Sequence, residues 1–535
     1  MIRKLPAQRI LVLGVLIILL VAACAPTATP ETSSDSSNSS ESTAPEAETA
    51  TKTLRIAGPF LSTPPEPVLG SGWYAIQWGA GETLMRLDDE FTPIPWLAEE
   101  LTQIDDLTWE IKLRPNVTFH DGTSVDAEAV KASLTRAIEN NATAAMLIDA
   151  QEITVVDELT LIITTNTPNL RMPGVLTEPT TLIVNAAAAT EQGDEQFGSK
   201  PIMTGPFMFE EVVIGQSASL RRNEDYWNGA AAVGAIEVAI LADTDARMLA
   251  LQSGEVDIAV DIPPESVAVA EADENLAVVQ AKPVATIFMY INQNKTKWQD
   301  SNLRQALALA TPNRDTLVKS VLRDQGVAGV GPFSPAVLAC ENLESHALDL
   351  SQARQLLAEA GYSDSDGDGI VEKDGETLTL LALTYPQRAP LTPSAEIVQA
   401  NLQEIGIKME IRSVEDINAA LTEPDWDLGF YFNNMASTGD PYGSLSNFYT
   451  ADGAANRGGY QNEAVEAAIA EMRDIADLGE RRAKACEISQ VILDDVAIVP
   501  LFYPFYSYGV STQVSGFDQA PAFFLYFVTP EMSVQ

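Results

Sequence analysis

Strand-like and helix-like patterns alternate along the chain from Thr53 onward, and this alternation limits the fold more than any other feature. Apolar and charged residues alternate over 109–113, which is typical of a half-buried strand. Asp126 follows a turn and is a suitable N-cap for the helix that we expect next. A strand over 377–384 and an amphipathic helix over 394–405 repeat the pattern later in the chain. We therefore expect an α/β fold whose sheets are covered by helices.

Length and charge restrict the classes of protein further. The chain has 535 residues, 46% of them hydrophobic, which is enough for more than one domain. Acidic residues outnumber basic ones by 75 to 32, and the net charge of −43 opposes nucleic-acid binding, which needs basic surfaces. It also repels anionic lipids, so any membrane attachment should be apolar or covalent. The charge could attract cationic solutes, or it could reflect habitat or lineage.

Histidine and cysteine are scarce. The two histidines, His120 and His346, lie far apart in the sequence, which argues against a histidine-rich metal site and against most histidine-based catalysis. The three cysteines, Cys24, Cys340 and Cys486, match no zinc motif. A disulfide between Cys340 and Cys486 and two separate buried thiols are both compatible with the sequence.

Residues 1–23 have the features of a secretory signal peptide. Three basic residues within 1–9 precede an uncharged apolar run at 10–23, which is shorter than the roughly 20 residues that span a bilayer. The run ends in Val-Ala-Ala directly before Cys24 and resembles a bacterial lipobox. The resemblance implies that Cys24 becomes a lipid-modified N-terminus. The alternatives are an ordinary signal peptide that contains Cys24 and an uncleaved anchor.

A polar stretch follows the apolar run. Residues 24–52 are rich in Ser, Thr, Ala, Pro and Glu and have no apolar periodicity. Such a segment buries too little apolar surface to offset the entropy of ordering it. We expect a disordered tether that lets a folded body reach a target near a membrane.

Five ordered blocks stand out across residues 53–535. The strongest, 109–130, combines a strand, an Arg-Pro turn, Phe-x-Asp-Gly and a helix start. The other four blocks are 81–88 with 95–100, 204–207 with 220–227, 250–257, and 291–292 with 302–307. Together they resemble the motifs of the bacterial extracellular solute-binding proteins of family 5, the oligopeptide, dipeptide and nickel group. Turn chemistry and aromatic packing also explain most of these residues, so we expect them to form the scaffold.

The resemblance implies a two-lobed fold of the periplasmic-binding-protein type with a hinge and an extra domain, three domains in all. The expected domains are a discontinuous base domain I at 53–70, 182–280 and 504–535, a family-specific domain II at 71–181, and a domain III at 281–503. Solute would bind between the lobes, and the lobes would close around it.

The function implied by the resemblance is that of a substrate-binding lipoprotein of an ABC importer. Its expected partners are a small solute, the permease subunits, and the membrane through the N-terminal lipid; we expect a monomer on the outer face of the cell membrane or in the periplasm. A di- or oligopeptide is the family default for the solute, with a nickel complex or an oligosaccharide as alternatives. A secreted enzyme or an adhesin is a more remote alternative, because the sequence has no Gly-x-Ser-x-Gly, His-Glu-x-x-His or P-loop motif.

Residues 428–452 form the most informative candidate site. An apolar strand at 428–432 leads into a Gly- and Asn-rich loop that contains Asp440 and Tyr442. Peptide-binding members of the family have Trp-x-x-Asp before an Asp/Glu-Pro pair, and the aspartate contacts the peptide ammonium. Here Asn434 and Ser437 occupy those two positions. Asp440 could replace the missing aspartate, or the solute lacks a free ammonium.

Two further groups of residues are candidates for binding. Tyr385 and Arg388 follow the strand 377–384 and could contact an anionic group, although a solvated loop explains them equally well. An acidic turn matches the first half of a calcium-binding loop, with Gly at its sharp bend but without Glu at the twelfth position. Its candidate ligands are Asp364, Asp366, Asp368, Ile370 and Glu372. The alternative is a solvated turn, and we expect no required cofactor.

Overall fold

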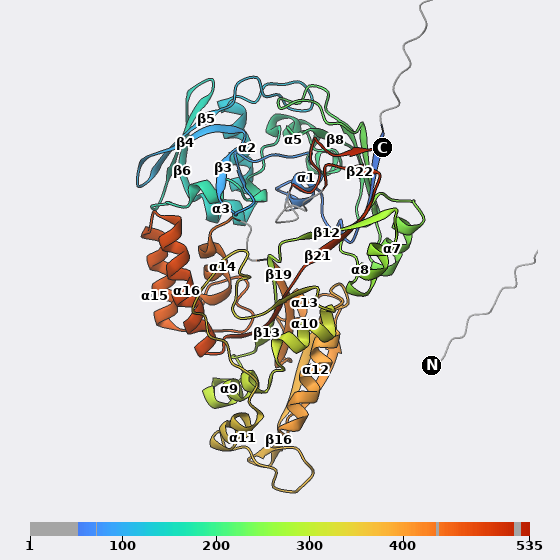
Figure 1. Ribbon diagram of the computed structural model, residues 1–535. Coiled ribbons are helices and arrows are strands. Elements are labelled where there is room, and N and C mark those ends of the chain that lie inside the picture. Colours follow the sequence, from blue (N-terminus) through green and yellow to red (C-terminus); the bar gives the residue numbers. More distant parts are fainter. Residues whose placement is uncertain (1–51, 71, 435–437, 518–525) are drawn as a thin grey trace, which may run out of the picture. The chain divides into compact units, whose positions relative to one another are not determined.

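The computed structural model describes residues 52–70, 72–434, 438–517 and 526–535 (Figure 1). All of them belong to one compact unit, Thr51–Gln535. Three larger sheets, each with its own hydrophobic core and helices, confirm the expected α/β fold. Cys24, the expected signal peptide and nearly all of the expected tether lie outside the described residues. In the described part of the chain, no helix is both long and apolar enough to cross a membrane.

The first sheet has seven strands in the order β12-β21-β11-β1-β10-β9-β8. Its strands are β1 (Thr53–Gly58), β8 (Phe207–Val213), β9 (Ser217–Arg222), β10 (Ala235–Ile240), β11 (Ile258–Ala259), β12 (Leu276–Ala281) and β21 (Tyr506–Ser511). β1 pairs in parallel with both β10 and β11, which come about 180 to 200 residues later in the chain. The nearby helices are α1 (Trp73–Gln77), α5 (Ala186–Gln192), α6 (Asp194–Ser199), α7 (Thr244–Gln252) and α8 (Pro264–Glu271). This sheet therefore joins segments from the start, the middle and the end of the described chain.

The second sheet has six strands in the order β14-β20-β13-β19-β17-β18. They are β13 (Ala285–Ile291), β14 (Gly326–Ala328), β17 (Thr379–Thr384), β18 (Lys408–Ser413), β19 (Leu428–Asn434) and β20 (Ile498–Pro504). Every residue of β13 is buried, as its unbroken apolar run predicts for a strand covered on both faces. The helices around it are α9 (Ser301–Ala310), α10 (Arg314–Leu322), α11 (Leu350–Glu359), α12 (Leu391–Glu404), α13 (Ile417–Ala420), α14 (Pro441–Tyr449), α15 (Glu463–Glu471) and α16 (Leu478–Asp494). The helix expected at 394–405 begins earlier, at Leu391, because proline is tolerated in a first helical turn.

The third sheet is antiparallel, in the order β4-β5-β7-β6. Its strands are β4 (Ala98–Asp105), β5 (Thr108–Leu113), β6 (Ala150–Asp157) and β7 (Thr160–Thr165), with helices α2 (Ala127–Asn140), α3 (Ala142–Ile148) and α4 (Met172–Val175) nearby. Asp126 caps α2 as predicted: its carboxylate accepts a 2.8 Å hydrogen bond from the Ala129 amide. The smaller two-stranded pairs are β2 (Met85–Leu87) with β3 (Pro93–Pro95), β15 (Glu372–Lys373) with β16 (Glu376–Thr377), and β22 (Val514–Ser515) with β23 (Ser533–Val534).

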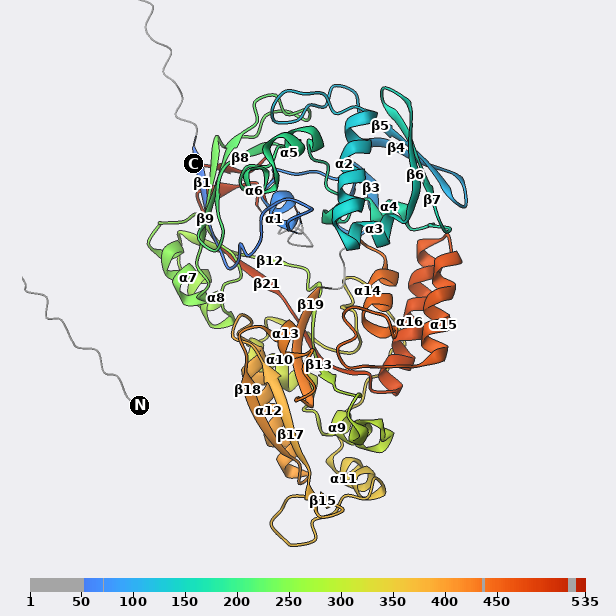
Figure 2. The ribbon, with the colours of Figure 1, turned by 180° about the vertical axis from the view of Figure 1, so that it is seen from behind.

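Two short crossovers join the first and second sheets. β12 ends at Ala281 and β13 begins at Ala285, while β20 ends at Pro504 and β21 begins at Tyr506. β12 and β21 pair with each other, so the two crossovers leave the first sheet side by side (Figures 1 and 2). Short paired connections are suitable places for a hinge. The hinge and the domain boundaries expected from the sequence stay predictions.

A buried carboxylate links two of the sequence blocks. Glu82, 5% exposed, accepts hydrogen bonds from Trp96 Nε1 at 2.8 Å, Thr204 Oγ1 at 2.7 Å, Tyr226 OH at 2.7 Å and Trp227 Nε1 at 3.2 Å. Burial raises the pKa of Glu82, and these donors oppose that shift. The blocks that resemble the family therefore serve as scaffold here, as expected from their turn and aromatic chemistry.

His120 makes a second link between sequence blocks. Its Nε2 lies 3.0 Å from the Gly205 carbonyl oxygen, and its Nδ1 lies 3.3 Å from the Met203 amide nitrogen. The amide can only donate, so Nδ1 accepts and Nε2 carries the proton, which is the neutral form of the ring. Burial lowers the pKa of His120 to about 4. This histidine therefore has a structural role, as its place in a strand-turn motif suggests.

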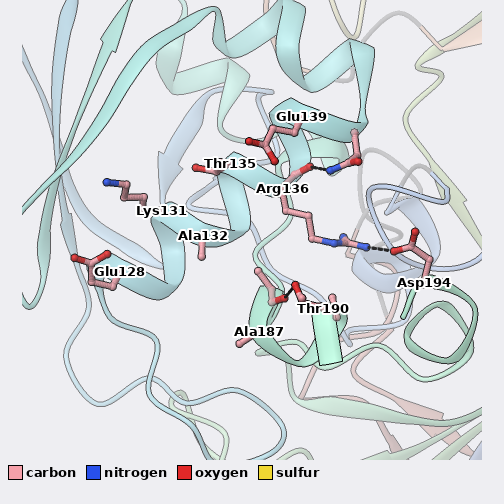
Figure 3. Close-up of a pocket in the computed structure, with 12 residues that line it drawn as sticks. Glu128, Lys131, Ala132, Thr135, Arg136, Glu139, Ala187, Thr190 and Asp194 are labelled. Atoms are coloured by element: carbon pink, nitrogen blue, oxygen red, sulfur yellow. Dashed lines mark hydrogen bonds and ion pairs between the residues drawn. The ribbon is translucent and has the colours of Figure 1, made fainter. Parts of the chain in front are cut away.

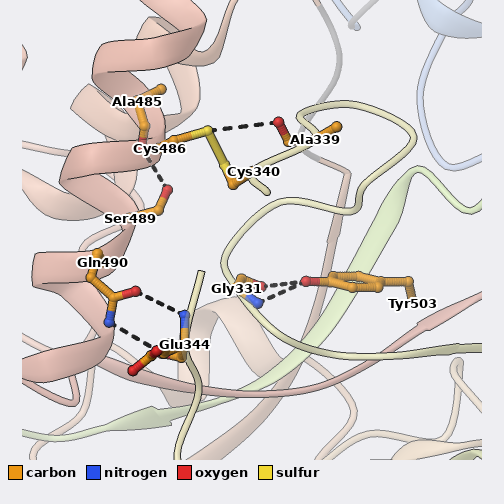
Figure 4. The surroundings of a disulfide bond; sticks show 9 residues. All are labelled: Gly331, Ala339, Cys340, Glu344, Ala485, Cys486, Ser489, Gln490 and Tyr503. Carbon is orange, nitrogen blue, oxygen red and sulfur yellow. Dashed lines mark hydrogen bonds between the residues drawn. A yellow bond between two sulfur atoms is a disulfide. The ribbon is translucent and has the colours of Figure 1, made fainter. Parts of the chain in front are cut away.

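A disulfide joins Cys340 to Cys486 on α16 and resolves the alternative that the sequence left open (Figure 4). The bond links residues 146 positions apart. Gln490, one turn further along α16, donates to the Glu344 carbonyl oxygen and accepts from the Glu344 amide. The disulfide and these hydrogen bonds together attach the irregular segment before α11 to α16.

We predict that His120 makes the stability of the protein depend on pH. The pKa of His120 in the unfolded chain is near 6.5, so the unfolded state binds a proton below this pH. The folded state binds this proton only near pH 4, and the unfolded state is therefore favoured as the pH falls between these values. The stability contributed by the neutral ring is complete above about pH 6.5 and is lost progressively between 6.5 and 4, up to about 3 kcal/mol. Urea unfolding of the wild type and of His120→Gln, at about pH 6.5 and at about pH 4, measures this loss of stability. The wild type should lose more stability than the variant; equal losses would contradict the prediction.

Candidate functional site

A small cavity lies where the first and second sheets face each other. Its volume is about 60 Å³, and its walls come from both sheets: residues 261–264 after β11, Ile287 on β13, the loop 387–390, Phe432 on β19, and 504–507 at the crossover. About two water molecules would fill this volume. Any larger solute therefore requires the walls of this cavity to move apart.

Arg388 is the cation of the cavity. It lies in the loop between the carboxyl end of β17 and the start of α12, and its side chain is 19% exposed. The guanidinium carbon lies 3.9 Å from the ring centre of Phe432 on the second sheet and 5.2 Å from that of Phe60, which follows β1 of the first sheet. Aromatic faces attract a guanidinium, most strongly where water is excluded. Arg388 therefore contacts both walls of the cavity.

Asp261 is the counter-charge on the opposite wall. Its Oδ2 lies 3.7 Å from Nη1 of Arg388. Asp261 lies two residues after the end of β11 and has a positive φ of 56°. Its carbonyl oxygen accepts a 2.9 Å hydrogen bond from Nη2 of the buried Arg247. The main chain at Asp261 is thus held in an uncommon conformation, which is a frequent feature of binding sites.

Aromatic side chains surround this ion pair. The ring centre of Tyr506 lies 6.1 Å from that of Phe432 on β19. The ring centre of Tyr385 lies 6.3 Å from that of Tyr431, which is also on β19. Burial raises the pKa of Tyr385 to about 12, and the charge of Arg388 partly opposes this shift. An enclosed aromatic site with one guanidinium suits a solute that carries both apolar surface and an anionic group.

The structure brings Tyr385 and Arg388 together, but it places Asp440 and Tyr442 elsewhere. Asp440 is 8% exposed; its Oδ2 accepts a 2.7 Å hydrogen bond from Nε of Arg481, and its Oδ1 caps α14 through the Tyr442 amide at 2.9 Å. The ring of Tyr442 stacks under the guanidinium of Arg171, 4.0 Å away. Because the carboxylate of Asp440 is already engaged, we do not retain it as the replacement for the missing aspartate.

Asn434 ends β19, two residues after Phe432, so the two side chains lie on the same face of the strand. Its Oδ1 is buried and accepts no hydrogen bond from the described residues. This oxygen could accept a hydrogen bond from an N–H or O–H group of a solute. Ser437, the other position identified from the family motif, lies outside the described residues.

The acidic turn forms a separate cluster. One carboxylate oxygen from each of Asp364, Asp366, Asp368 and Glu372 lies within 4.8 Å of the others, and Ile370 belongs to the same loop. The sequence pattern thus identifies side chains that converge in space.

A larger hollow of about 630 Å³ lies on the surface between α2 and α5 (Figure 3). Arg136 at its edge already pairs with Glu66 at 2.9 Å and Asp194 at 3.3 Å. The hollow is open to solvent and draws its walls from neighbouring helices. We favour the smaller cavity as the functional site because it is more enclosed than the hollow and because Arg388 and Asp261, which carry opposite charges, both line it.

Sequence reasoning missed Asp261, Phe60 and Phe432 as site residues. Asp261 had a usable signal, since a charged residue directly after an apolar strand often faces a site at the sheet edge. Phe432 was assigned only to the strand, where any apolar side chain fits. Phe60 carried no signal, because its role depends on contact with a loop more than 300 residues later.

Comparison with known proteins agrees with this architecture. A sequence model described as bacterial extracellular solute-binding proteins, family 5 Middle, matches residues 92–456. The nickel-binding protein NikA of Staphylococcus aureus is 25% identical over 79% of this chain and 82% of its own length. A crystal structure of NikA from this organism with Ni(L-His)2 has a TM-score of 0.79 and covers 90% of this chain and all of that one. The oligopeptide-binding protein AppA of Bacillus subtilis is 25% identical over 83% of this chain and 84% of its own length, and its nonapeptide complex has a TM-score of 0.76 over 90% of this chain and 99% of that one. The glutathione-binding protein GsiB of Pectobacterium atrosepticum is 29% identical over 71% of this chain and 74% of its own length.

We predict that Asp440→Ala lowers stability rather than selectively removing solute binding. The substitution leaves Arg481 buried without its carboxylate partner and removes the cap of α14, which should cost about 3–5 kcal/mol. Urea unfolding monitored by tryptophan fluorescence measures the loss, with the exposed Asp452→Ala as the matched control. Unchanged stability together with lost solute binding would instead identify Asp440 as a ligand residue.

Proposed function

The chain belongs to the bacterial extracellular solute-binding proteins of family 5, and we propose that it is the solute receptor of an ABC importer whose solute carries an anionic group held by Arg388. Family membership supports the receptor role, in which a solute is captured between two lobes and passed to a membrane permease. The observation that carries the proposal is the position of Arg388 in the cavity wall, where it contacts Phe432 of the second sheet and Asp261 of the first.

A carboxylate on the solute suits this position best. Arg388 can donate two parallel hydrogen bonds to a carboxylate, and a charge-assisted pair of this kind gains strength in a cavity that excludes water. The pair with Asp261 is long, at 3.7 Å, so an incoming carboxylate can displace or join it at moderate cost. Contact of one bound group with both walls would favour the closed arrangement, and the solute would thereby drive closure.

A di- or oligopeptide is the first candidate solute. Its terminal carboxylate would bind Arg388, its side chains would contact Tyr385 and Phe432, and a backbone N–H could donate to Oδ1 of Asn434. The aspartate that binds a peptide ammonium in other members is replaced in this sequence by Ser437. A peptide would therefore be held mainly through its carboxyl end and its apolar surface.

A nickel complex is the second candidate. Both histidines of the chain are outside the cavity wall, and His120 is engaged by Met203 and Gly205. A nickel ion would therefore have to arrive with its own nitrogen ligands, and Arg388 would bind a carboxylate of that complex. An uncharged oligosaccharide would give Arg388 no anionic partner, so we place it third.

We predict that Arg388→Ala weakens binding of the solute about 10- to 1000-fold, because a buried charge-assisted contact is lost. A thermal-shift screen of peptides, nickel chelates and oligosaccharides would first identify the solute, and isothermal titration calorimetry would then compare affinities. Arg412→Ala is the matched control, since Arg412 lies on the same sheet with an exposed side chain. Equal affinity of Arg388→Ala and wild type would contradict the role of Arg388; a screen in which peptides leave the melting temperature unchanged while another class raises it would remove only the peptide assignment.

We further propose that Cys24 carries the lipid that anchors the receptor on the outer face of the membrane. Support comes from the lipobox-like sequence before Cys24 and from the polar stretch behind it. We predict that Cys24→Ser moves the protein from the membrane fraction to the soluble fraction of a bacterium that processes lipoproteins, whereas Ser36→Ala stays with the membrane. Continued membrane attachment of Cys24→Ser would favour an uncleaved protein anchor.

A further inference from the structure

The loop after α11 is closed at its base and folded around its own carboxylates. Ser363 and Glu372 form an antiparallel bridge that joins the two ends of the loop. Within it, the two oxygens of Asp364 accept hydrogen bonds from the amides of Gly367 at 2.7 Å and Gly369 at 3.0 Å. Both glycines have a positive φ, 80° and 90°, which residues with a side chain rarely adopt. The loop therefore presents the convergent carboxylates in a defined geometry.

Glu372 provides an independent sign that a cation binds here. The residue is 8% exposed, and although its Oε2 accepts hydrogen bonds from the amide and hydroxyl of Ser365, its Oε1 is fully buried and receives no hydrogen bond from any described residue. A buried, unpartnered carboxylate oxygen is costly unless a positive charge neutralises it. Lys373, the adjacent residue, could supply a positive charge, but its ammonium lies over the ring of Tyr362, 5.3 Å from the ring centre. Among the described residues, this carboxylate oxygen thus has no hydrogen-bond donor, and three further carboxylates lie beside it.

We propose that the loop 364–372 binds one calcium ion through the carboxylates of Asp364, Asp366, Asp368 and Glu372. Calcium binds oxygen at about 2.3–2.6 Å, so oxygens on opposite sides of the ion lie about 4.6–5.2 Å apart. The converging oxygens lie within 4.8 Å of one another, which suits calcium without contraction of the loop. Magnesium would require opposite oxygens at about 4.0–4.2 Å and a stricter octahedral arrangement. The ion would also provide Oε1 of Glu372 with the positive partner that it lacks among the described residues.

The place of the loop indicates a structural role for the ion. The amide of Val371 donates to the carbonyl oxygen of Gly406, in the turn between α12 and β18, and the amide of Leu378 donates to the carbonyl oxygen of Val371. In Figure 1 the loop lies beside α11 and β16, at the end of the second sheet away from β12 and β21. The ion would therefore stabilise the packing of α11 against the α12–β18 turn. It should leave solute binding at the distant cavity unchanged, so its presence can be tested without knowing the solute.

The test is calcium binding by the purified full chain after removal of divalent ions with a chelator. Isothermal titration calorimetry should show one calcium ion per chain, with a dissociation constant of about 0.1–1 mM, the range of extracellular calcium modules. About 10 mM calcium should raise the melting temperature by about 2 °C or more, because ligand that binds only the folded state stabilises it. Magnesium at the same concentration is the control for general charge screening.

Two variants and a matched control make the site specific. Glu372→Gln should weaken calcium binding at least 10-fold and abolish the thermal shift, and Asp366→Asn, which alters an exposed side chain and so leaves folding intact, should do the same. Glu376→Gln, the same substitution at an exposed position four residues away, should retain both. Absence of calcium uptake up to about 10 mM would overturn the proposal. Equal shifts in all variants, or equal shifts with magnesium, would also overturn it, since they would arise from diffuse screening of the acidic surface.

Discussion

The buried carboxylate of Glu82 is the interaction on which the rest of the scaffold depends. It collects hydrogen bonds from Trp96, Thr204, Tyr226 and Trp227, whose positions span more than 130 residues. A buried charge is tolerated only when its partners are fixed in place, so the carboxylate requires these segments to keep one arrangement. His120 adds a neutral contact to the same turn through Gly205. These hydrogen bonds connect segments next to the first sheet with segments next to the third sheet.

The two crossovers are the connections at which we expect a hinge between the first and second sheets. The second sheet has its own core, its own helices and the disulfide to α16, and it continues into the first sheet at 281–285 and 504–506. The cavity lies beside the second of these crossovers. Arg388 contacts both walls there, and Tyr442 and Arg171 form a further contact between α14 and the segment before α4. A solute that binds Arg388 would therefore act at the place where a small change in contacts alters the balance between open and closed arrangements.

Local patterns in the sequence predicted local structure well. The cap of α2 by Asp126 depends on residues within one turn, and the order of the family blocks depends on no long-range geometry at all. The pairing of Cys340 with Cys486 remained open because it depends on how two segments 146 residues apart meet. The contact of Asp440 with Arg481, 41 residues later, could not be predicted for the same reason, and a role of Asp440 in solute binding stays a prediction. The cavity walls combine Asp261, Arg388 and Phe432, and of these three only Arg388 stood out, as a basic residue in the loop after a strand.

A receptor of this kind captures one intact solute per chain at the cavity of Arg388. Native mass spectrometry of protein purified gently from its producing cells measures this capture. We expect one small molecule per chain, bearing a carboxylate, that is lost from Arg388→Ala and is recovered chemically unchanged after prolonged incubation with the wild type. A protein that retains no solute and gains none from a broad mixture, or that converts the added molecules into products, would contradict it.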